Sequence, residues 1–488
     1  MSVAAFNILI FITILNVMKL SHLCGGSPSN DSSANNFPDR MGINSQRLGN
    51  TQRKFVANVN SCTSYNQTFC LEWADKHPYV DDMDDEIPFV IDMKASTHDD
   101  EDNYFQYVIS TKQLLRNAAK YSNICADGTY RVVFFGYPLL VVGSIDSNRS
   151  FHLIAASLCV SEKTTDYEFL FEAIKKGVNT VTNESFMPDK MISDAAPAII
   201  NAFYKIFADS AQANVICWAH VKRNVCQKTN NEDMLSDISK LQLSYNSYTF
   251  ERGVKLFMRK WRKTEKSFCD YFKKVWLDKN SSWYEGYLSS FPSTNNACES
   301  HNDVIKRKYT FRRRLSIIKF NEQLFKLFND FSVSYNIKRS YAMTPSIETN
   351  IWTNGIEWAK SKEINVILGK RNDDTQLMYI PSSKFVIENN RFLLETDVDD
   401  LKFNRNNNFD EFFENVFKIW IVEFNLNDWK NSNCTCHSFM KLFYCKHVIG
   451  LSLRFGKVKA PAVANPATLG EKKKRGRPKA TRKALIRQ

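Results

Sequence analysis

Short apolar runs separated by turn signals dominate the stretch from Ile124 to Val160, which reads ICADGTYRVVFFGYPLLVVGSIDSNRSFHLIAASLCV. Three runs rich in β-branched and aromatic residues are divided by GYP at 136–138 and by DSN at 146–148. Runs of this length, bounded by Gly, Pro, Asn and Asp, are typical of consecutive strands. The pattern therefore predicts three antiparallel strands.

Downstream of these strands, helix-like and strand-like spacing alternate, and upstream of them Tyr104–Ala119 has helix-like spacing. An antiparallel meander followed by β-α-β units indicates an α/β domain with a mixed sheet. The predicted helices are Asp166–Val178, Ala195–Phe207 and one that starts near Val221, and the predicted strands are Lys190–Ser193 and Ala213–Ala219.

Helical spacing with many aromatic residues fills residues 230–290, which we interpret as a helical insertion. The polar loop Ser293–Glu299 has helix-start chemistry and precedes a long helix, and Phe320–Tyr335 is again helical. Residues 375–425 alternate as strands do, with a helix at Asp410–Phe417. The Gly-, Ser-, Asn- and Asp-rich composition of residues 25–50 predicts a flexible linker, and the polar, basic composition after Gly456 predicts a disordered tail, so we expect disordered termini.

These patterns divide the chain into segments. They are an apolar N-terminal segment and flexible linker at 1–50, an N-terminal region at 51–119, the α/β domain at 120–320 with its insertion at about 230–290, a helical or mixed connection at 321–405, a small cysteine-rich module at 406–455 and a disordered basic tail at 456–488.

Composition and charge narrow the class of protein. Of the 488 residues, 43% are hydrophobic and 13% aromatic, which is enough for a sizeable core and excludes general disorder. Much of the net charge of +13 lies in Lys306–Arg314 and Lys472–Lys483. Such concentration indicates a polyanionic partner, nucleic acid before membrane, with a solvated surface as the alternative. Nothing in the pattern points to a small-molecule substrate.

The N-terminus gives a conflicting signal about localisation. Ala4–Met18 is apolar like the core of a signal peptide, but it lacks a basic flank and is shorter than a membrane span. A buried helix or strand, or a mis-joined translated exon, are the alternatives. Most of the twelve cysteines are scattered like reduced, buried thiols. We therefore expect a nuclear protein, with secretion as a minority alternative.

Three carboxylates occupy positions suited to metal chemistry. Asp127 lies inside the first predicted strand, where burying its charge is costly unless a cation meets it. Asp194 follows a strand, and Glu299 lies near a helix start. Acids on three elements can hold two divalent ions for phosphodiester chemistry, and hard oxygen ligands favour Mg²⁺ or Mn²⁺. With 52 acids in the chain, a helix cap or a surface acid is the alternative for each.

Local context strengthens this hypothesis, because the runs ADGTY, MISDAAPAI, CWAH and TNNACESHNDVIK occur in this order. Over roughly residues 100–320 the sequence resembles the transposases of Mutator-like elements (MULE), whose catalytic domain has an RNase H-like fold. The resemblance implies that Asp127, Asp194 and Glu299 bind the catalytic metals. It also implies that Cys217 and His220 match the family's Cys-x-x-His pair and that the insertion precedes the glutamate.

The role of Cys217 and His220 stays open from the residues alone. They could bind one zinc, although a full site needs about four ligands and no second pair is evident. His220 could instead contact a phosphate, and a buried Cys beside a hydrogen-bonded His is the third alternative.

The run CTCHSFMKLFYCKH, from Cys434 to His447, gives Cys-x-Cys followed by Cys-x-His. Thiolates and imidazole suit Zn²⁺, and four such ligands close a tetrahedron. The run resembles a SWIM-type zinc finger, a module that often follows a Mutator-like catalytic domain. The predicted ligands are Cys434, Cys436, Cys445 and His447, with His437 as a competitor for one place.

Basic residues supply the predicted DNA contacts. The tail resembles an AT-hook, in which arginines enter a narrow minor groove, and it would also serve as a nuclear localisation signal; a nonspecific basic tail is the alternative. The predicted contacts are Arg475, Gly476, Arg477 and Pro478 in the tail, and Lys306, Arg307, Lys308, Arg312, Arg313 and Arg314 in the α/β domain.

The sequence therefore predicts a transposase that cuts double-stranded DNA and joins the freed 3′-hydroxyl to target DNA, in a homo-oligomer. One alternative is a domesticated DNA-binding regulator that no longer cuts, as plant far-red-response transcription factors are. Another is a protein in which only the zinc module functions. The family often carries an N-terminal zinc-binding domain, but Cys62 and Cys70 lack partners at finger spacing.

Overall fold

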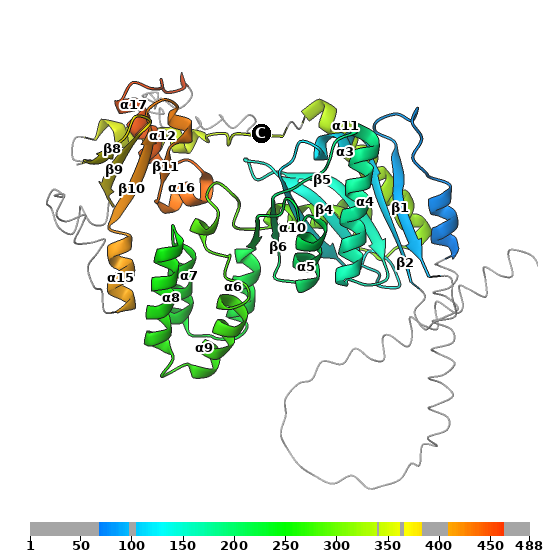
Figure 1. Cartoon of the computed structure of the whole chain (residues 1–488), viewed down its shortest axis with the longest axis horizontal. Helices are drawn as coiled ribbons and strands as arrows, with labels where there is room; N and C mark the ends of the chain where they lie inside the picture. The colour runs from blue at the N-terminus through cyan, green and yellow to red at the C-terminus, as the bar shows by residue number, and fades with distance from the viewer. Residues whose placement is uncertain (1–67, 97–103, 339–340, 362–365, 383–407, 463–488) are drawn as a thin grey trace, which may run out of the picture. The chain divides into compact units, whose positions relative to one another are not determined.

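The computed structural model describes residues 68–96, 104–338, 341–361, 366–382 and 408–462 (Figure 1). The chain divides into two compact units, Met1–Ser61 and Cys62–Gln488, and every described residue belongs to the second unit. The apolar segment Ala4–Met18, Cys62 and the basic tail Lys472–Lys483 lie outside the described residues, so the predictions made for them stay predictions.

A seven-stranded mixed sheet forms the centre of the α/β domain, in the order β1-β2-β5-β4-β3-β6-β7. β3 pairs parallel with β6, and β6 pairs parallel with β7, while the other neighbours are antiparallel. The predicted meander and the mixed sheet are thereby confirmed. The strands are β1 (Pro88–Ala95), β2 (Phe105–Thr111), β3 (Asn123–Thr129), β4 (Leu139–Ile145), β5 (Phe151–Cys159), β6 (Lys190–Ser193) and β7 (Ala213–Ile216).

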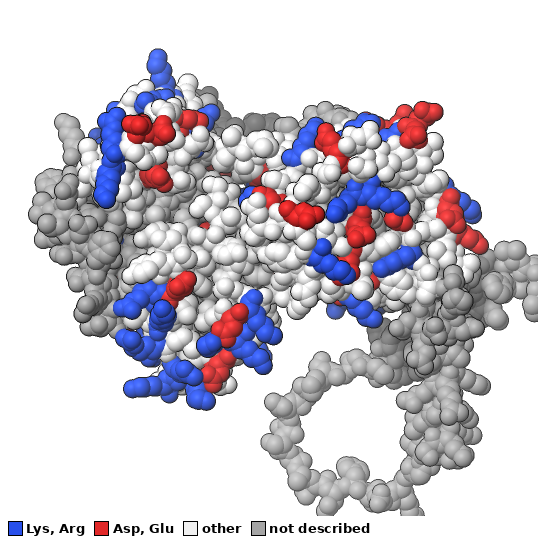
Figure 2. All heavy atoms as spheres, in the orientation of Figure 1, with Lys and Arg blue, Asp and Glu red and all other residues white. Residues whose placement is uncertain are grey.

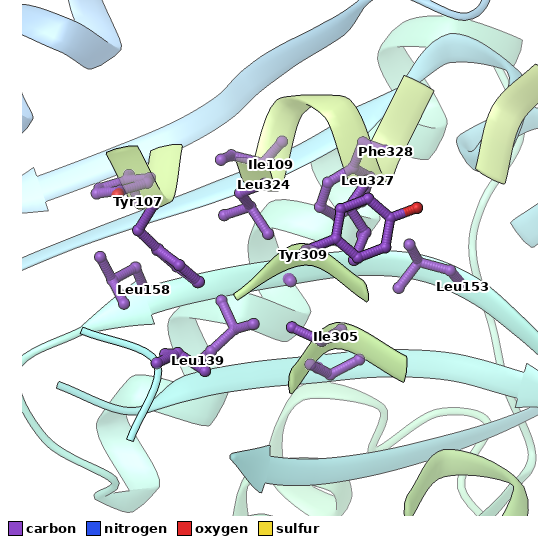
Figure 3. Close-up of a cluster of buried hydrophobic side chains, with 14 of the residues drawn as sticks. Tyr107, Ile109, Leu139, Leu153, Leu158, Ile305, Tyr309, Leu324, Leu327 and Phe328 are labelled. Carbon is purple, nitrogen blue, oxygen red and sulfur yellow. The ribbon is translucent and has the colours of Figure 1, made fainter. Parts of the chain in front are cut away.

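Helices cover both faces of this sheet, because its strands are apolar on both sides. α3 (Lys112–Ala118), α4 (Thr164–Thr182) and α5 (Pro197–Ile206) share one core with the sheet (Figure 1). On the other face lie α10 (Asn296–Val304), the π-helical turn η3 (Ile305–Tyr309) and α11 (Ile317–Lys338). Figure 3 shows this second core, in which the sheet residues Tyr107, Ile109, Leu139, Leu153 and Leu158 meet Ile305, Tyr309, Leu324, Leu327 and Phe328.

The prediction of one helix over Tyr104–Ala119 was wrong in its first half. Residues 105–111 form β2, which is buried along its whole length between β1 and β5. A strand buried on both faces loses the polar alternation that identifies strands in sequence. Thr111 then accepts a hydrogen bond from the Leu114 N–H and caps α3. The sheet therefore extends N-terminally across the border that we drew at residue 120.

The insertion that follows α6 (Trp218–Cys226) is helical, as its spacing predicts. It contains α7 (Glu232–Gln242), α8 (Ser247–Trp261), α9 (Lys266–Phe272), the π-helical turn η1 (Lys273–Leu277) and the short 3-10 helix η2 (Glu285–Tyr287). The much later α15 (Phe409–Val416) packs against α8, where Phe413 touches Gly253. Asp410 of α15 also pairs with Lys260 at 2.8 Å. The predicted segment 406–455 thus begins with a helix that belongs to the insertion's core.

A second, four-stranded antiparallel sheet in the order β11-β10-β9-β8 carries the C-terminal module. Helix α12 packs so closely on α17 that a Cβ at Gly355 or Gly450 would overlap Ile449 or Trp358. The module consists of α12 (Thr349–Lys360), β8 (Ile367–Arg371), β9 (Thr375–Pro381), β10 (Ile419–Asn425), η4 (Trp429–Asn431), β11 (Asn433–Cys434), α16 (His437–Leu442) and α17 (Lys446–Arg454).

In the part of the chain that the structure describes, none of the helices combines the length and the hydropathy that crossing a bilayer requires.

Candidate active site and metal-ligand clusters

Asp127 lies near the C-terminal end of the central strand β3. Successive side chains of a strand point to opposite faces, so Asp127 shares the face of Cys125, which packs beside Cys298 of α10. Asn302, also on α10, donates a hydrogen bond from Nδ2 to Oδ2 of Asp127 at 2.7 Å. The first predicted acid is therefore placed under the helix that carries Glu299.

Asp194 directly follows β6, the parallel neighbour of β3. Because Cys125 pairs with Ile192, continuing the register places Asp194 level with Asp127 at the same sheet edge. Oδ1 of Asp194 accepts the Ala196 N–H at 3.0 Å, which orients the carboxylate at the start of α5. The C-terminal ends of neighbouring parallel strands thus bring the first two predicted acids together.

Glu299 lies in the first turn of α10. Two hydrogen bonds attach the preceding loop to the turn between β7 and α6: the Trp218 N–H donates to the Ser293 carbonyl at 2.9 Å, and the Asn295 N–H donates to Sγ of Cys217 at 3.1 Å. His220 Nε2 lies 3.2 Å from Glu299 Oε1, and Arg223 Nη2 lies 3.8 Å from Oε2. The third acid is therefore held by α6.

Glu299, Cys217 and His220 form a group that we call the edge cluster. One ligand atom from each lies within 4.8 Å of the others. Among the residues that the structure describes, Asp127, Asp194 and Glu299 do not together meet this spacing. The edge cluster thus joins the predicted glutamate to the two residues whose role the sequence left open.

The charges of these acids act strongly on one another. Burial, followed by the charge of Asp194, raises the pKa of the Asp127 carboxyl from 3.8 to about 7, although the hydrogen bond from Asn302 lowers it. The charges of Glu299 and Glu162 raise this pKa further. Carboxylates gathered without a cation repel one another, so the site has the electrostatics of an incomplete cation site.

Sequence reasoning missed Glu162, which lies between β5 and α4 and whose charge raises the pKa of Asp127. The Tyr167 hydroxyl donates to Oε1 of Glu162 at 2.7 Å, and the Tyr130 hydroxyl donates to Oε2. A Cβ at Gly128 would overlap the Glu162 carboxylate, so a larger residue there would require the Glu162 side chain to move. Asn302 and Arg223 were missed as well. Asn302 lies in the quoted run that contains Glu299, but no spacing rule singles it out.

Cys434, Cys436, Cys445 and His447 form the second group, which we call the C-terminal cluster. All four residues are buried, and their ligand atoms lie within 4.8 Å of one another. Cys434 ends β11, Cys436 precedes α16, and Cys445 and His447 flank the start of α17. Two tight helix starts and one strand end therefore bring together residues from both halves of the motif.

The spacing in the C-terminal cluster fits a tetrahedral zinc ion. Sγ of Cys434 lies 3.7 Å from Nδ1 of His447, and a zinc tetrahedron requires about 3.6 Å between sulfur and nitrogen ligands. Burial raises the pKa of the Cys434 and Cys445 thiols, so binding of a metal would release protons. The four residues together could hold a structural metal.

His437 does not belong to the C-terminal cluster. Its ring packs edge-on against Phe417 and Trp420, at centroid distances of 4.6 and 5.0 Å. Burial lowers the pKa of His437, which favours the neutral ring in this aromatic contact. The structure thus separates the competitor from the four candidate ligands.

The basic residues Lys306–Arg314 follow α10 over η3 and an exposed turn. Phe311 and Arg312 take up left-handed backbone conformations in that turn, and Phe311 is 71% exposed. Asp303 pairs with both Arg307 and Arg312, at 3.2 and 2.9 Å. Lys308 pairs with Asp330 at 3.1 Å. Among the described acids none pairs with Arg313 or Arg314, so this turn retains unneutralised positive charge.

Comparison with known proteins identifies one segment of the chain. Residues 123–224 match the model of the MULE transposase domain. The matched segment runs from β3 into α6, contains Asp127, Asp194, Cys217 and His220, and ends before Glu299. No curated protein matches the chain. Over residues 123–224 the chain is therefore similar to a transposase.

Proposed function

We propose that the protein is a DDE-type DNA transposase, in which Asp127, Asp194 and Glu299 hold two divalent ions. The observation that carries this proposal is the edge formed by β3 and β6. Two acids lie level there, within a segment similar to a MULE transposase domain, and α10 covers the edge with a third. The strand order β5-β4-β3-β6-β7, with its parallel side at β6 and β7, supports an RNase H-like fold.

The chain's own residues prepare this edge for metal binding. Two Mg²⁺ or Mn²⁺ ions, when bound, would activate the attacking oxygen and stabilise the leaving oxygen. Asn302 fixes Asp127 through Oδ2, and the Ala196 N–H fixes Asp194 through Oδ1, so each carboxylate keeps a second oxygen for other ligands. With a pKa of about 7, Asp127 must lose its proton before it binds a cation.

DNA would be held by basic side chains of the α/β domain and of its helical insertion. Arg313 and Arg314 are exposed, and among the described acids none pairs with them, whereas Arg307 and Arg312 both pair with Asp303. Residues 252–279 of the insertion hold ten Lys or Arg and three Asp or Glu. Figure 2 shows basic side chains gathered over these insertion helices. Lys and Arg that neutralise phosphates supply sequence-independent affinity for double-stranded DNA.

The C-terminal cluster would hold a structural Zn²⁺ in a SWIM-type module. Four buried thiol and imidazole groups favour Zn²⁺ over Mg²⁺, and a four-ligand site leaves no place for a substrate. DNA binding by this module, AT-hook contacts by the tail and nuclear localisation are further parts of the proposal. A homo-oligomer is also expected, because transposition usually pairs two element ends.

The test is nicking and strand transfer on plasmid DNA that carries the element ends, with Mg²⁺ or Mn²⁺ supplied. Asp194→Asn keeps the side chain's shape but removes its charge, and it should reduce nicking on the order of 1,000-fold. Asp209→Asn, an exposed acid in the turn after α5, is the matched control and should cut at the wild-type rate. Equal cutting by Asp194→Asn and Asp209→Asn would refute the three-acid site.

A second candidate function is a DNA-binding regulator that no longer cuts. It is favoured by the position of Glu299, which lies with His220 and Arg223 and not within metal-sharing distance of both aspartates. The same assay separates the two functions. A wild-type chain that binds the element ends tightly but leaves them uncut at every metal concentration would be a regulator.

A further inference from the structure

We infer that Cys217, His220 and Glu299 bind a soft divalent cation, with Zn²⁺ as the best fit, and that this ion withdraws Glu299 from the catalytic Mg²⁺. The binding site itself follows from the geometry of the edge cluster. The consequence for Glu299 rests on the proposed function. Among the described residues it would be a second zinc site beside the C-terminal cluster, and it would be regulatory where the C-terminal cluster is structural.

The edge cluster leaves two buried polar atoms without hydrogen bonds among the described residues. Nδ1 of His220 and Oε1 of Glu299 are buried and accept or donate no hydrogen bond among the described residues. His220 Nε2 is 3.2 Å from Oε1, but the contact lacks hydrogen-bond geometry. Buried polar atoms are costly to leave unpaired. A cation between the imidazole, the carboxylate and the nearby thiol would pair Oε1 of Glu299 and one ring nitrogen of His220.

The surroundings of the Cys217 sulfur also suit a metal ligand. Cys217 is buried and directly precedes α6, and its sulfur accepts the Asn295 N–H at 3.1 Å. The C-terminal cluster uses the same device, since Cys434 accepts the Cys436 N–H and Cys436 accepts the Phe439 N–H, both at 3.4 Å. Burial raises the pKa of the Cys217 thiol, whereas the backbone donors lower it and favour the thiolate, which is the form that binds a metal.

The chemical identity of the three ligand atoms in the edge cluster selects the metal. One sulfur, one imidazole nitrogen and one carboxylate oxygen suit Zn²⁺ far better than Mg²⁺, which prefers oxygen ligands. Three protein ligands leave one tetrahedral position for water or for an oxygen of DNA phosphate. Arg223 lies next to Oε2, the other oxygen of Glu299, so Oε1 stays available to the cation.

Glu299 would then belong to two alternative sites. Held by zinc with Cys217 and His220, it cannot complete the oxygen set of Asp127 and Asp194. Released, it can turn to the aspartates and serve the catalytic ions. Zn²⁺ should therefore inhibit Mg²⁺-dependent cutting by competition for one carboxylate.

The binding test measures zinc in the purified full-length chain after dialysis with Zn²⁺. If each cluster takes one ion, the wild type holds about two zinc ions and Cys217→Ser holds about one. Cys226→Ser, an exposed cysteine at the end of the same helix, is the matched control and should hold about two. His220→Asn repeats the test without altering the Cys217 sulfur that accepts the Asn295 N–H. Equal zinc content in wild type, Cys217→Ser and His220→Asn would overturn the site.

Cobalt gives a second readout that does not depend on activity. Co²⁺ bound to a thiolate has a sulfur-to-metal charge-transfer band. The two clusters together offer four thiolates, and Cys217→Ser removes one of them, so the intensity of the band should fall by the contribution of one thiolate. Nicking assays then test the consequence, with each variant compared with its own zinc-free rate. Zn²⁺ should inhibit the wild type and Cys226→Ser but not Cys217→Ser. Equal inhibition of all three proteins would refute competition for Glu299. A wild-type chain that never cuts would refute the proposed function. In that case the measured zinc content would still decide whether the edge cluster binds zinc.

Discussion

The C-terminal cluster and the edge cluster use similar ligands in different surroundings. Cys434, Cys436, Cys445 and His447 are all buried, and they come from a strand and two helix starts within one small module. In the edge cluster only Cys217 is fully buried, while the side chains of His220 and Glu299 are 17% and 32% exposed. A closed set of four ligands serves folding, and an incomplete set at a sheet edge can exchange its ion.

The comparison also separates two uses of a helix start. In the C-terminal cluster, α16 and α17 begin with ligands that hold the module's core together. In the edge cluster, the starts of α6 and α10 bring Glu299 beside His220 at the edge of the large sheet. Loss of the first cluster should therefore cost structure, whereas loss of zinc binding at the second should remove inhibition by zinc.

The largest expected effect is that of breaking the C-terminal cluster. Cys436→Ser, or removal of zinc by a strong chelator, should unfold the module that contains β8–β11, because zinc binding contributes on the order of 10 kcal/mol in small zinc domains. Hydrogen exchange should show loss of protection in α12, α17 and β10 but not in β3–β5. Unchanged protection in the C-terminal module would contradict a structural zinc.

The next effect concerns pH at the catalytic edge. Protonation of Asp127 opposes metal binding, so apparent Mg²⁺ affinity should fall about tenfold per pH unit below its pKa of about 7. Asp194→Asn removes a charge that raises the pKa of Asp127. The Mg²⁺ affinity that this variant retains should therefore depend on pH only at a lower pH than in the wild type. Calorimetric titration of the chain with Mg²⁺ between pH 6 and 8, flanking that pKa, checks this. Affinity that does not change over this interval would be contrary to the account.

The raised pKa of Asp127 also makes folding stability depend on pH in the absence of metal. Between pH 3.8 and about pH 7 the folded chain keeps a proton on Asp127 that the unfolded chain has lost. Stability should therefore fall as pH rises through this window, and Mg²⁺ should restore it at higher pH. Thermal unfolding with and without Mg²⁺ measures this difference, and Asp127→Asn should abolish it.

A smaller effect is expected for Asn302→Ala. Asn302 lowers the pKa of Asp127 by its hydrogen bond, so its loss should move the pH dependence of cutting upward and slow cutting about tenfold. As a control, Asn302→Gln can restore a donor and part of the rate. A lower rate with an unmoved pH profile would show that Asn302 acts only through packing.

The smallest effect is on stability when the edge cluster is broken. Cys217→Ser removes a buried sulfur that accepts one backbone N–H, and similar changes cost about 1 kcal/mol. Urea unfolding of Cys217→Ser should thus show a small change in midpoint, whereas in Cys436→Ser the C-terminal module should unfold. Loss of the large sheet in Cys217→Ser would make the edge cluster structural and erase the difference between the two clusters.

The sequence predicted these two regions unequally. In the C-terminal cluster the ligands lie close along the chain, so spacing alone selected the four residues that the structure brings together. The strands that carry Asp127 and Asp194 were predicted because turn signals bound them. β2 was missed because burial on both faces removed its alternation. The contacts of Glu299 with His220 and Arg223 join distant segments, and no local pattern encodes them.

The most direct test of the account is a crystal structure of the chain with Mn²⁺ and an element end, located by the anomalous signal of the metal. The account predicts Mn²⁺ between Asp127 and Asp194, with Glu299 turned from His220 toward the metal. Manganese absent from that edge, with Glu299 still beside His220 and DNA bound elsewhere, would contradict it.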